Sequence, residues 1–94
     1  MMKVMCDPAK NAANIAKHGF SLQDAAGLEW EAAVVWLDSR RDYGEPRMVG
    51  LVPVNDRLFC VVFVDRSFEE LTERRIISLR RANNREVQRY ANDD

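Results

Sequence analysis

The segment RMVGLVPVNDRLFCVVFVD, residues 47–65, contains the strongest structural signal in the chain. Two apolar runs rich in valine flank Asn55-Asp56, a dipeptide typical of tight turns. We therefore expect Arg47 to Val54 to form one strand and Leu58 to Asp65 to return beside it as an antiparallel hairpin. Pro53 has no backbone N–H, which restricts its end of the first strand to an edge or a bulge.

Further strands are expected on both sides of this hairpin. Ala32 to Leu37 is a continuous apolar run that predicts a strand, and Arg74 to Leu79 predicts a last one. Lys3 to Cys6 can form a short first strand. The segment Asp38 to Pro46 is expected to be a charged loop, and Phe68 to Glu73 a loop or short turn.

A first helix is expected directly after the short N-terminal strand. Asp7 is a good N-cap and Pro8 fits the first helical position. The helix should continue to about His18 and stop at Gly19, which suits a left-handed C-cap. Its small apolar residues share one stripe, as in a helix that packs on a core, and these are Ala9, Ala12, Ala13 and Ala16 with Ile15 beside them.

Two more helices complete the expected elements. One should span Leu22 to about Glu29 after a capping motif at Ser21, and Asn83 or Asn84 should cap a final helix through Tyr90. This order predicts an α+β fold, with an antiparallel sheet of three to four strands, two N-terminal helices and one C-terminal helix. The 94 residues are expected to form a single domain, 1–94, whose last few residues fray.

The composition is that of an ordinary soluble globular domain, 47% hydrophobic and 31% charged. No signal peptide or membrane span is evident, so we expect a cytoplasmic protein. The two cysteines, Cys6 and Cys60, are then expected to be reduced thiols. Because His18 is the one histidine, no metal site is expected, and no other cofactor motif is present in the sequence.

The net charge of −1 hides an uneven distribution. Residues 1–20 contain three lysines and one aspartate, residues 21–70 contain ten acids and five arginines, and residues 71–94 contain six arginines and four acids. If the two ends of the chain meet, they form a basic face. The same pattern also fits a solvated surface with local ion pairs.

Four clusters have residue types suited to phosphate chemistry, although each also fits an ordinary solvated surface. Lys10, Lys17 and His18 share the first helix, where they could bind phosphate and transfer protons. Glu45 lies near Arg47 in the middle of the chain, as a candidate general base. Arg66 follows the most apolar strand, where it could clamp a phosphate.

The fourth cluster, at the C-terminus, is the richest in arginine. Strict alternation puts Ile76, Ser78 and Arg80 on one face of the last strand and Arg75, Ile77 and Leu79 on the other. Glu86 and Tyr90 share a face of the final helix. Such a set could supply positive charge, a base and a proton donor.

Together these motifs resemble the BrnT family of toxins over nearly the whole chain. The N-terminal match is Asp7-Pro8-Ala9-Lys10, Asn14, Lys17-His18-Gly19-Phe20-Ser21 and Asp24-Ala25-Ala26. The C-terminal match is Arg75-Ile76-Ile77-Ser78-Leu79-Arg80-Arg81-Ala82, Glu86 and Tyr90. Between them Asp42-Tyr43-Gly44-Glu45, Arg47 and Arg66 match in order.

The resemblance implies a RelE-like fold and a metal-independent endoribonuclease that inhibits translation and growth. It also implies a ribbon-helix-helix antitoxin of the BrnA type, through which the complex would bind operator DNA. By similarity to RelE-type toxins, Arg66, Arg80 and Tyr90 would line the RNA site. His18 and Glu86 are further catalytic candidates, and the RNA-binding candidates are Lys10, Lys17, Arg75 and Arg81. The general base stays open among His18, Glu45 and Glu86.

One departure from the family pattern favours a different function. Cys6 stands where the family usually has tryptophan, and the loss of an aromatic that stacks on RNA would weaken activity. The alternative is therefore a weak or inactive toxin-like module that acts as antitoxin partner and co-repressor. A DNA-binding protein is a third class, but no basic recognition helix is evident, since the last helix has only Arg85 and Arg89.

Overall fold

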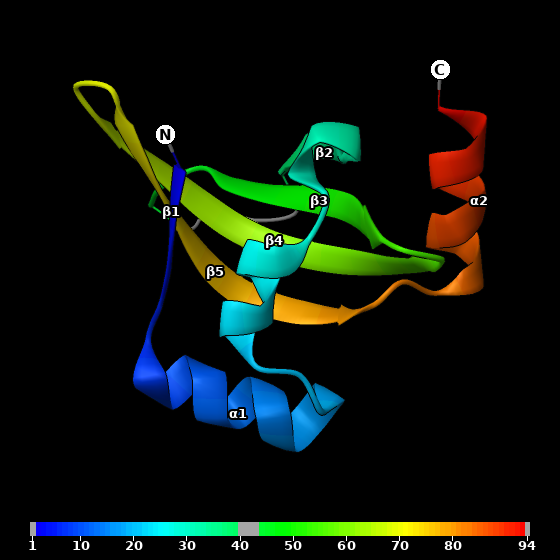
Figure 1. The fold of residues 1–94 in the computed structure, drawn as a ribbon, viewed down its shortest axis with the longest axis horizontal. Coiled ribbons are helices and arrows are strands. Elements are labelled where there is room, and N and C mark those ends of the chain that lie inside the picture. The colour runs from blue at the N-terminus through cyan, green and yellow to red at the C-terminus, as the bar shows by residue number, and fades with distance from the viewer. Residues whose placement is uncertain (1, 40–43, 94) are drawn as a thin grey trace.

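The computed structural model describes residues 2–39 and 44–93 (Figure 1). Five strands form one sheet in the order β1-β5-β4-β3-β2. They are β1 (Met2–Cys6), β2 (Val34–Asp38), β3 (Arg47–Val54), β4 (Arg57–Phe68) and β5 (Leu71–Arg81). The helices are α1 (Pro8–His18), the 3₁₀ helices η1 (Leu22–Gly27) and η2 (Trp30–Ala32), and α2 (Asn84–Asn92). Within the described ranges, none of the helices has the length and apolar character that crossing a membrane requires.

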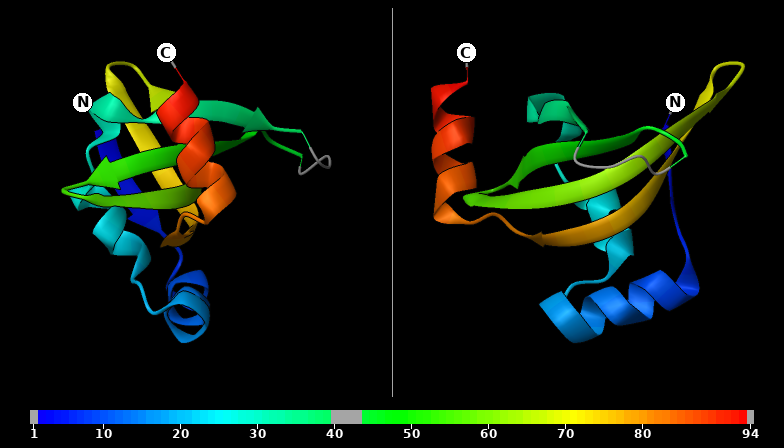
Figure 2. Two further views of the ribbon diagram at one scale, coloured as in Figure 1. Left: turned by 90° about the vertical axis from the view of Figure 1, so that its right-hand side faces the viewer. Right: turned by 180° about the vertical axis from the view of Figure 1, so that it is seen from behind.

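The hairpin of β3 and β4 is confirmed. Val54 pairs with Arg57, and Asn55 turns the chain with a positive φ of 54°. The connection expected between Phe68 and Glu73 is instead mostly strand, because β4 and β5 continue pairing up to Phe68 and Leu71. This second hairpin extends beyond the rest of the sheet, at the end opposite to α2 (Figure 2).

The sheet is mixed and has five strands, so the expectation of a purely antiparallel sheet of three to four strands is wrong. The strands that follow Ala32 are all antiparallel, as predicted. The difference is β1, which lies parallel to β5 from Met2 opposite Thr72 to Cys6 opposite Ile76. Parallel neighbours need a long crossover, and nearly the whole domain separates these two strands along the chain.

The ends of α1 follow the sequence prediction, whereas the second helix does not. Asp7 accepts a hydrogen bond from the Lys10 N–H (3.0 Å), and Gly19 closes the helix with a φ of 82°. After Ser21 the chain forms η1 rather than an α-helix to Glu29. The Glu29 N–H donates to the Pro53 carbonyl (2.8 Å) near the end of β3. This hydrogen bond replaces the one that Glu29 would make within an α-helix.

The side of α1 that faces the sheet is polar. Asn14 is buried, with 6% of its surface exposed, and its amide accepts from the Leu79 N–H (3.1 Å) and donates to the Leu79 carbonyl (2.9 Å). The pairing of β1 with β5 ends at Ile76. Beyond that point the Asn14 side chain makes the hydrogen bonds to β5 that a neighbouring strand would make. The stripe expected to pack on a core is exposed, namely Ala9, Ala12, Ala13 and Ala16 with Ile15.

The two faces of the sheet have different cover. The face under η1, here the η1 face, holds the main core of Leu22, Ala25, Val52, Phe59, Val61, Phe63, Ile76 and Leu79. The opposite face, here the open face, holds Val49, Leu51 and Cys60, with Trp36 and Tyr90 packed against them. The predicted alternation in β5 fails at Ile76, because Ile77 is an extra residue between the pairs Val62–Ser78 and Phe63–Ile76.

Candidate active site

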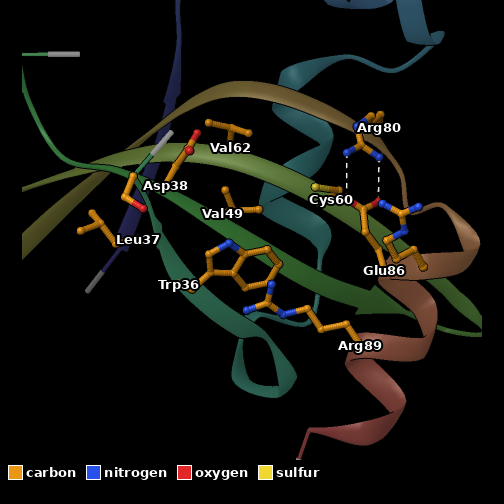
Figure 3. A pocket seen from close by; sticks show the side chains of 11 residues that line it. Trp36, Leu37, Asp38, Val49, Cys60, Val62, Arg80, Glu86 and Arg89 are labelled. Carbon is orange, nitrogen blue, oxygen red and sulfur yellow. Dashed lines mark hydrogen bonds and ion pairs between the residues drawn. The ribbon is translucent and has the colours of Figure 1, made fainter. Parts of the chain in front are cut away.

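Arg80, near the end of β5, and Glu86, in the first turn of α2, form a bidentate ion pair. Arg80 Nη1 and Nη2 donate to Glu86 Oε1 and Oε2, each at 2.8 Å (Figure 3). Asn83 begins α2 with a capping box, in which its side chain accepts from the Glu86 N–H and its own N–H donates to Glu86 Oε1, each at 2.9 Å. The cap therefore orients the carboxylate that holds Arg80.

This arrangement keeps Glu86 ionised. The hydrogen bonds from Arg80 are the main reason why the pKa of Glu86 falls from 4.5 to about 2. Burial acts in the opposite direction, and the Asn83 N–H, the Arg80 charge and the Cys60 thiol add to the lowering of this pKa. A carboxylate with so low a pKa is a weak base, which makes Glu86 a counter-ion for Arg80 more than a general base.

A groove of about 510 Å³ lies between α2 and the open face. Its apolar floor includes Val49, Cys60 and Val62. Its polar lining includes three arginines and two acids, namely Arg80, Arg85, Arg89, Asp38 and Glu86. This concentration of guanidinium groups suits a phosphate ligand.

Trp36 forms part of the same groove. It is half-buried on β2, and the Arg89 guanidinium lies 3.7 Å from the centre of its ring (Figure 3). No sequence motif pointed to a site at Trp36, Asp38, Arg85 or Arg89. The signals were present, since Trp36 and Asp38 share a strand face, and Arg85 and Arg89 are one helical turn apart.

Lys10, Lys17 and His18 come together beside β5. With Ser78 they line a shallow depression of about 190 Å³, and His18 is half-buried there. Ser78 and Arg80 are two residues apart on the open face, which is roughly 7 Å along the strand. Lys10, Lys17 and His18, here the α1 cluster, therefore flank β5 close to Arg80.

The other two predicted arginines of β5 lie on different faces. Arg75 pairs with Val64, in the row next to the Val62–Ser78 pair, and shares the open face with Arg80. Arg81 is exposed and pairs with Phe59, whose side chain belongs to the η1-face core. Only Arg75 therefore extends the basic surface around Arg80 along the open face.

Arg66 is not brought to Arg80. Arg66 pairs with Glu73 and Arg80 pairs with Cys60, so six positions along β4 separate them, roughly 20 Å. Arg66 Nη2 contacts Glu45 Oε2 at 3.2 Å, and both side chains are exposed. The structure therefore separates Arg66 from Arg80, although both were expected to line the RNA site, and Glu45 lies at the Arg66 end.

Tyr90 fastens α2 to η2. Its hydroxyl donates to the Ala32 carbonyl at 2.7 Å, while its ring packs beside the open-face cluster. Tyr90 and Glu86 share a helix face as expected, but the Tyr90 proton is directed at the backbone. For Tyr90 to transfer a proton to RNA, this bond would first have to break.

The Cys6 position meets the core and not the open face. Cys6 is half-buried and packs against the η1-face cluster. A side chain here affects packing, so the exchange of tryptophan for cysteine does not remove an aromatic from the groove. This takes away the sequence feature that favoured an inactive module.

Two further expectations concern metal ligands and the middle motif. Among residues 2–39 and 44–93, no three His, Cys, Asp or Glu side chains are grouped closely enough to hold a metal ion. Cys6 and Cys60 are free thiols. Asp42 and Tyr43 of the middle motif lie outside the described residues.

The fold and the groove define a small α+β domain with an arginine-rich site on one face of its sheet. A family model described as the ribonuclease toxin BrnT of type II toxin–antitoxin systems matches residues 6–86. The chain therefore belongs to the BrnT family of ribonuclease toxins, which confirms the resemblance seen in the sequence motifs.

A solved structure supports this assignment. The chain is similar to the 1.1 Å crystal structure of the Brucella abortus ribonuclease toxin BrnT, with a TM-score of 0.61 and 27% identity. The match covers 89% of this chain and 100% of the Brucella chain. A comparison with curated proteins gives no match.

Proposed function

We propose that this toxin is a metal-independent endoribonuclease that cleaves RNA, stops translation and growth, and is neutralised by an antitoxin of the BrnA type. The observation that supports cleavage at this site is the position of Arg80. It lines an arginine-rich groove and lies two residues along β5 from Ser78, which lines the depression next to Lys10, Lys17 and His18. Arginine neutralises a developing phosphorane through two parallel hydrogen bonds.

The chemistry can use the 2′-hydroxyl of the RNA as nucleophile. Its oxygen attacks phosphorus, the 5′-oxygen leaves, and a cyclic phosphate forms. This reaction needs a base for the 2′ proton, a cation for the phosphorane and an acid for the leaving oxygen. Arg80 supplies the cation, while Glu86 stays its counter-ion and keeps the guanidinium oriented at the groove.

We assign the base to His18. Glu86 is held ionised by Arg80, which lowers its pKa to about 2, and Glu45 lies with Arg66 at the far end of β4. His18 lines the same depression as Ser78, and Ser78 lies two residues before Arg80 on β5. Lys10, Lys17 and Arg75 contact the RNA backbone near the reacting phosphate. Arg66, at the far end of β4, and Arg81, on the η1 face, make no contact with the reacting phosphate.

The antitoxin completes the proposed system. A type II toxin–antitoxin system pairs a toxin with a protein antitoxin, and we propose a ribbon-helix-helix protein of the BrnA type in that role. DNA contacts to the operator would come from this antitoxin. Because cellular RNA is the proposed substrate, we place the activity in the cytoplasm.

Induced expression in a bacterial host tests this function. The wild-type chain should arrest growth, and co-expression of the antitoxin encoded beside it should restore growth and co-purify with the chain. Growth unaffected by a soluble, expressed wild-type chain would contradict the toxin function. Growth arrest that the neighbouring gene does not relieve would contradict the pairing.

A further inference from the structure

We propose that Trp36 is a stacking platform for one unpaired nucleobase of the RNA, and that Arg85 and Arg89 hold the phosphate next to that base. This inference rests on the proposed function and adds the nucleotide subsite. It assigns the β2 side of the groove to a base and the α2 side to the backbone.

The surroundings of Trp36 suit a ligand. The side chain is half-buried, packs against the cluster of Val49 and Cys60, and lines the groove. Among the residues that the structure describes, the indole N–H has no hydrogen-bond acceptor. The ring is covered by the guanidinium of Arg89, which is exposed to solvent and comes from α2 (Figure 3).

Trp30 shows what a structural tryptophan looks like in the same chain. Its indole N–H donates to the Ala25 carbonyl at 2.8 Å, and its ring packs edge to face with that of Phe63. The cation above it, Arg74, is fixed by two 2.7 Å hydrogen bonds to Asp65. Trp36 shares the stacked arginine but has neither the bonded indole nor the fixed cation.

The charges around Trp36 favour an anion. Arg80 is neutralised by Glu86, whereas neither Arg85 nor Arg89 has an ion-pair partner among the described residues. Asp38 lines the groove as well, but it is buried and already has an interaction of its own. The α2 side of the groove therefore keeps two positive charges that no side chain described there balances.

A base can displace Arg89 from Trp36. Stacking of a base on an aromatic ring is stronger than a cation–π contact at an exposed site. The displaced guanidinium stays on α2, where it can bind the phosphate of the same nucleotide. One movement thus creates both halves of the subsite.

The test measures binding of a 2′-O-methyl oligoribonucleotide, which lacks the attacking hydroxyl. Trp30→Phe leaves Trp36 as the sole tryptophan, and its fluorescence should change on binding. Trp36→Phe leaves Trp30 and should show no change. If Trp30→Phe does not fold, the signal of the wild type minus that of Trp36→Phe gives the same information.

An abasic position in the oligonucleotide tests stacking directly. Against the wild type, removal of the stacked base should weaken binding about 10-fold, within the range for base–aromatic stacking. Against Trp36→Ala the intact and abasic probes should bind equally. Val35→Ala, one residue away on the other face of β2, is the matched control and should behave as wild type.

The outcomes separate the subsite from the function. If the wild type cleaves RNA while Trp36 fluorescence is unaffected and Trp36→Ala distinguishes the probes as wild type does, the subsite is wrong and the ribonuclease stands. If Trp36 responds to the antitoxin but not to any oligonucleotide, the site belongs to a protein partner and the proposal is overturned. If the wild type neither binds nor cleaves RNA, the proposed function fails as well.

Discussion

Arg80 and Glu86, six residues apart in sequence, join the last strand to the last helix through two hydrogen bonds of 2.8 Å. The helix α2 has no buried residue, so its attachment depends on a few contacts of this kind. The others are the bond from Tyr90 to the Ala32 carbonyl and the stacking of Arg89 on Trp36. The pair thus orients the proposed catalytic arginine and also holds the wall of its groove.

The pair makes the stability of the domain depend on pH in acid. Folding lowers the pKa of Glu86 from 4.5 to about 2, so its contribution is complete above pH 4.5 and disappears as the pH falls toward 2. At neutral pH, Glu86→Gln should lower the free energy of unfolding by roughly 1.5–3 kcal/mol, the range for hydrogen bonds to charged groups. Urea unfolding of both proteins at several pH values measures this difference.

Glutamine can keep the capping box, so this substitution removes the charge and the acceptor for one Arg80 hydrogen bond while the cap stays in place. The difference between wild type and Glu86→Gln should shrink steadily between pH 4.5 and 2. A difference that is constant over that range would show that the Glu86 carboxylate is not coupled to the fold in this way.

Asn14 should be essential for the position of α1. Asn14→Ala leaves the buried N–H and carbonyl of Leu79 without partners, and should lower the free energy of unfolding by roughly 2–4 kcal/mol. Ala12→Ser, on the exposed side of the same helix, should change it by less than about 0.5 kcal/mol. Thermal or urea unfolding distinguishes the two, and equal effects would contradict the strand-like role of Asn14.

Arg66 should contribute to RNA binding at most and not to the chemical step. Its ion pair with Glu45 is exposed, so Arg66→Ala should change stability by less than about 1 kcal/mol. We expect a higher KM that becomes less sensitive to salt, with kcat unchanged, because a distant backbone contact binds substrate and transition state equally. A loss of kcat as large as that of Arg80→Ala would place Arg66 at the reacting phosphate.

His18 should act in proton transfer. His18→Gln should lower kcat by about 10²–10⁴, the usual contribution of a general base, and should remove one limb of the pH–rate profile. Glu45→Gln, at the far end of β4, is the control and should keep the wild-type profile. If His18→Gln keeps the full rate and profile, another group is the base.

Local patterns in the sequence predicted the parts of the fold that depend on neighbours along the chain. The Asn55 turn, the Asp7 cap and the Gly19 stop are all of this kind. Pairing of β1 with β5 could not be predicted, because it joins the two ends of the chain and leaves no local periodicity. The bulge at Ile77 could not be predicted either, since it arises from the β4 partner strand.

Local sequence patterns also could not predict how the residues of the candidate site are arranged. The family motif contained Arg80 and Glu86, but the residue types could not show that they neutralise each other, because that depends on how α2 folds back. The resemblance implied that Arg66 and Arg80 line one RNA site, whereas the register of β4 and β5 separates them by six positions along β4. Trp36 was hidden in an apolar run that predicts a strand equally well with or without a functional side chain.

Cleavage of RNA by the purified chain in excess EDTA, with wild type and Arg80→Ala side by side, is the most direct test. The wild type should cleave at full rate with the chelator. Arg80→Ala should lose about 10²–10³ in rate, typical for one lost donor to a developing oxyanion, while it still folds and still binds the antitoxin. Arg80→Lys should recover little, because a point charge does not reproduce the bidentate fork. Loss of wild-type activity in EDTA would contradict metal-independent cleavage, and full activity of Arg80→Ala would remove Arg80 from the site.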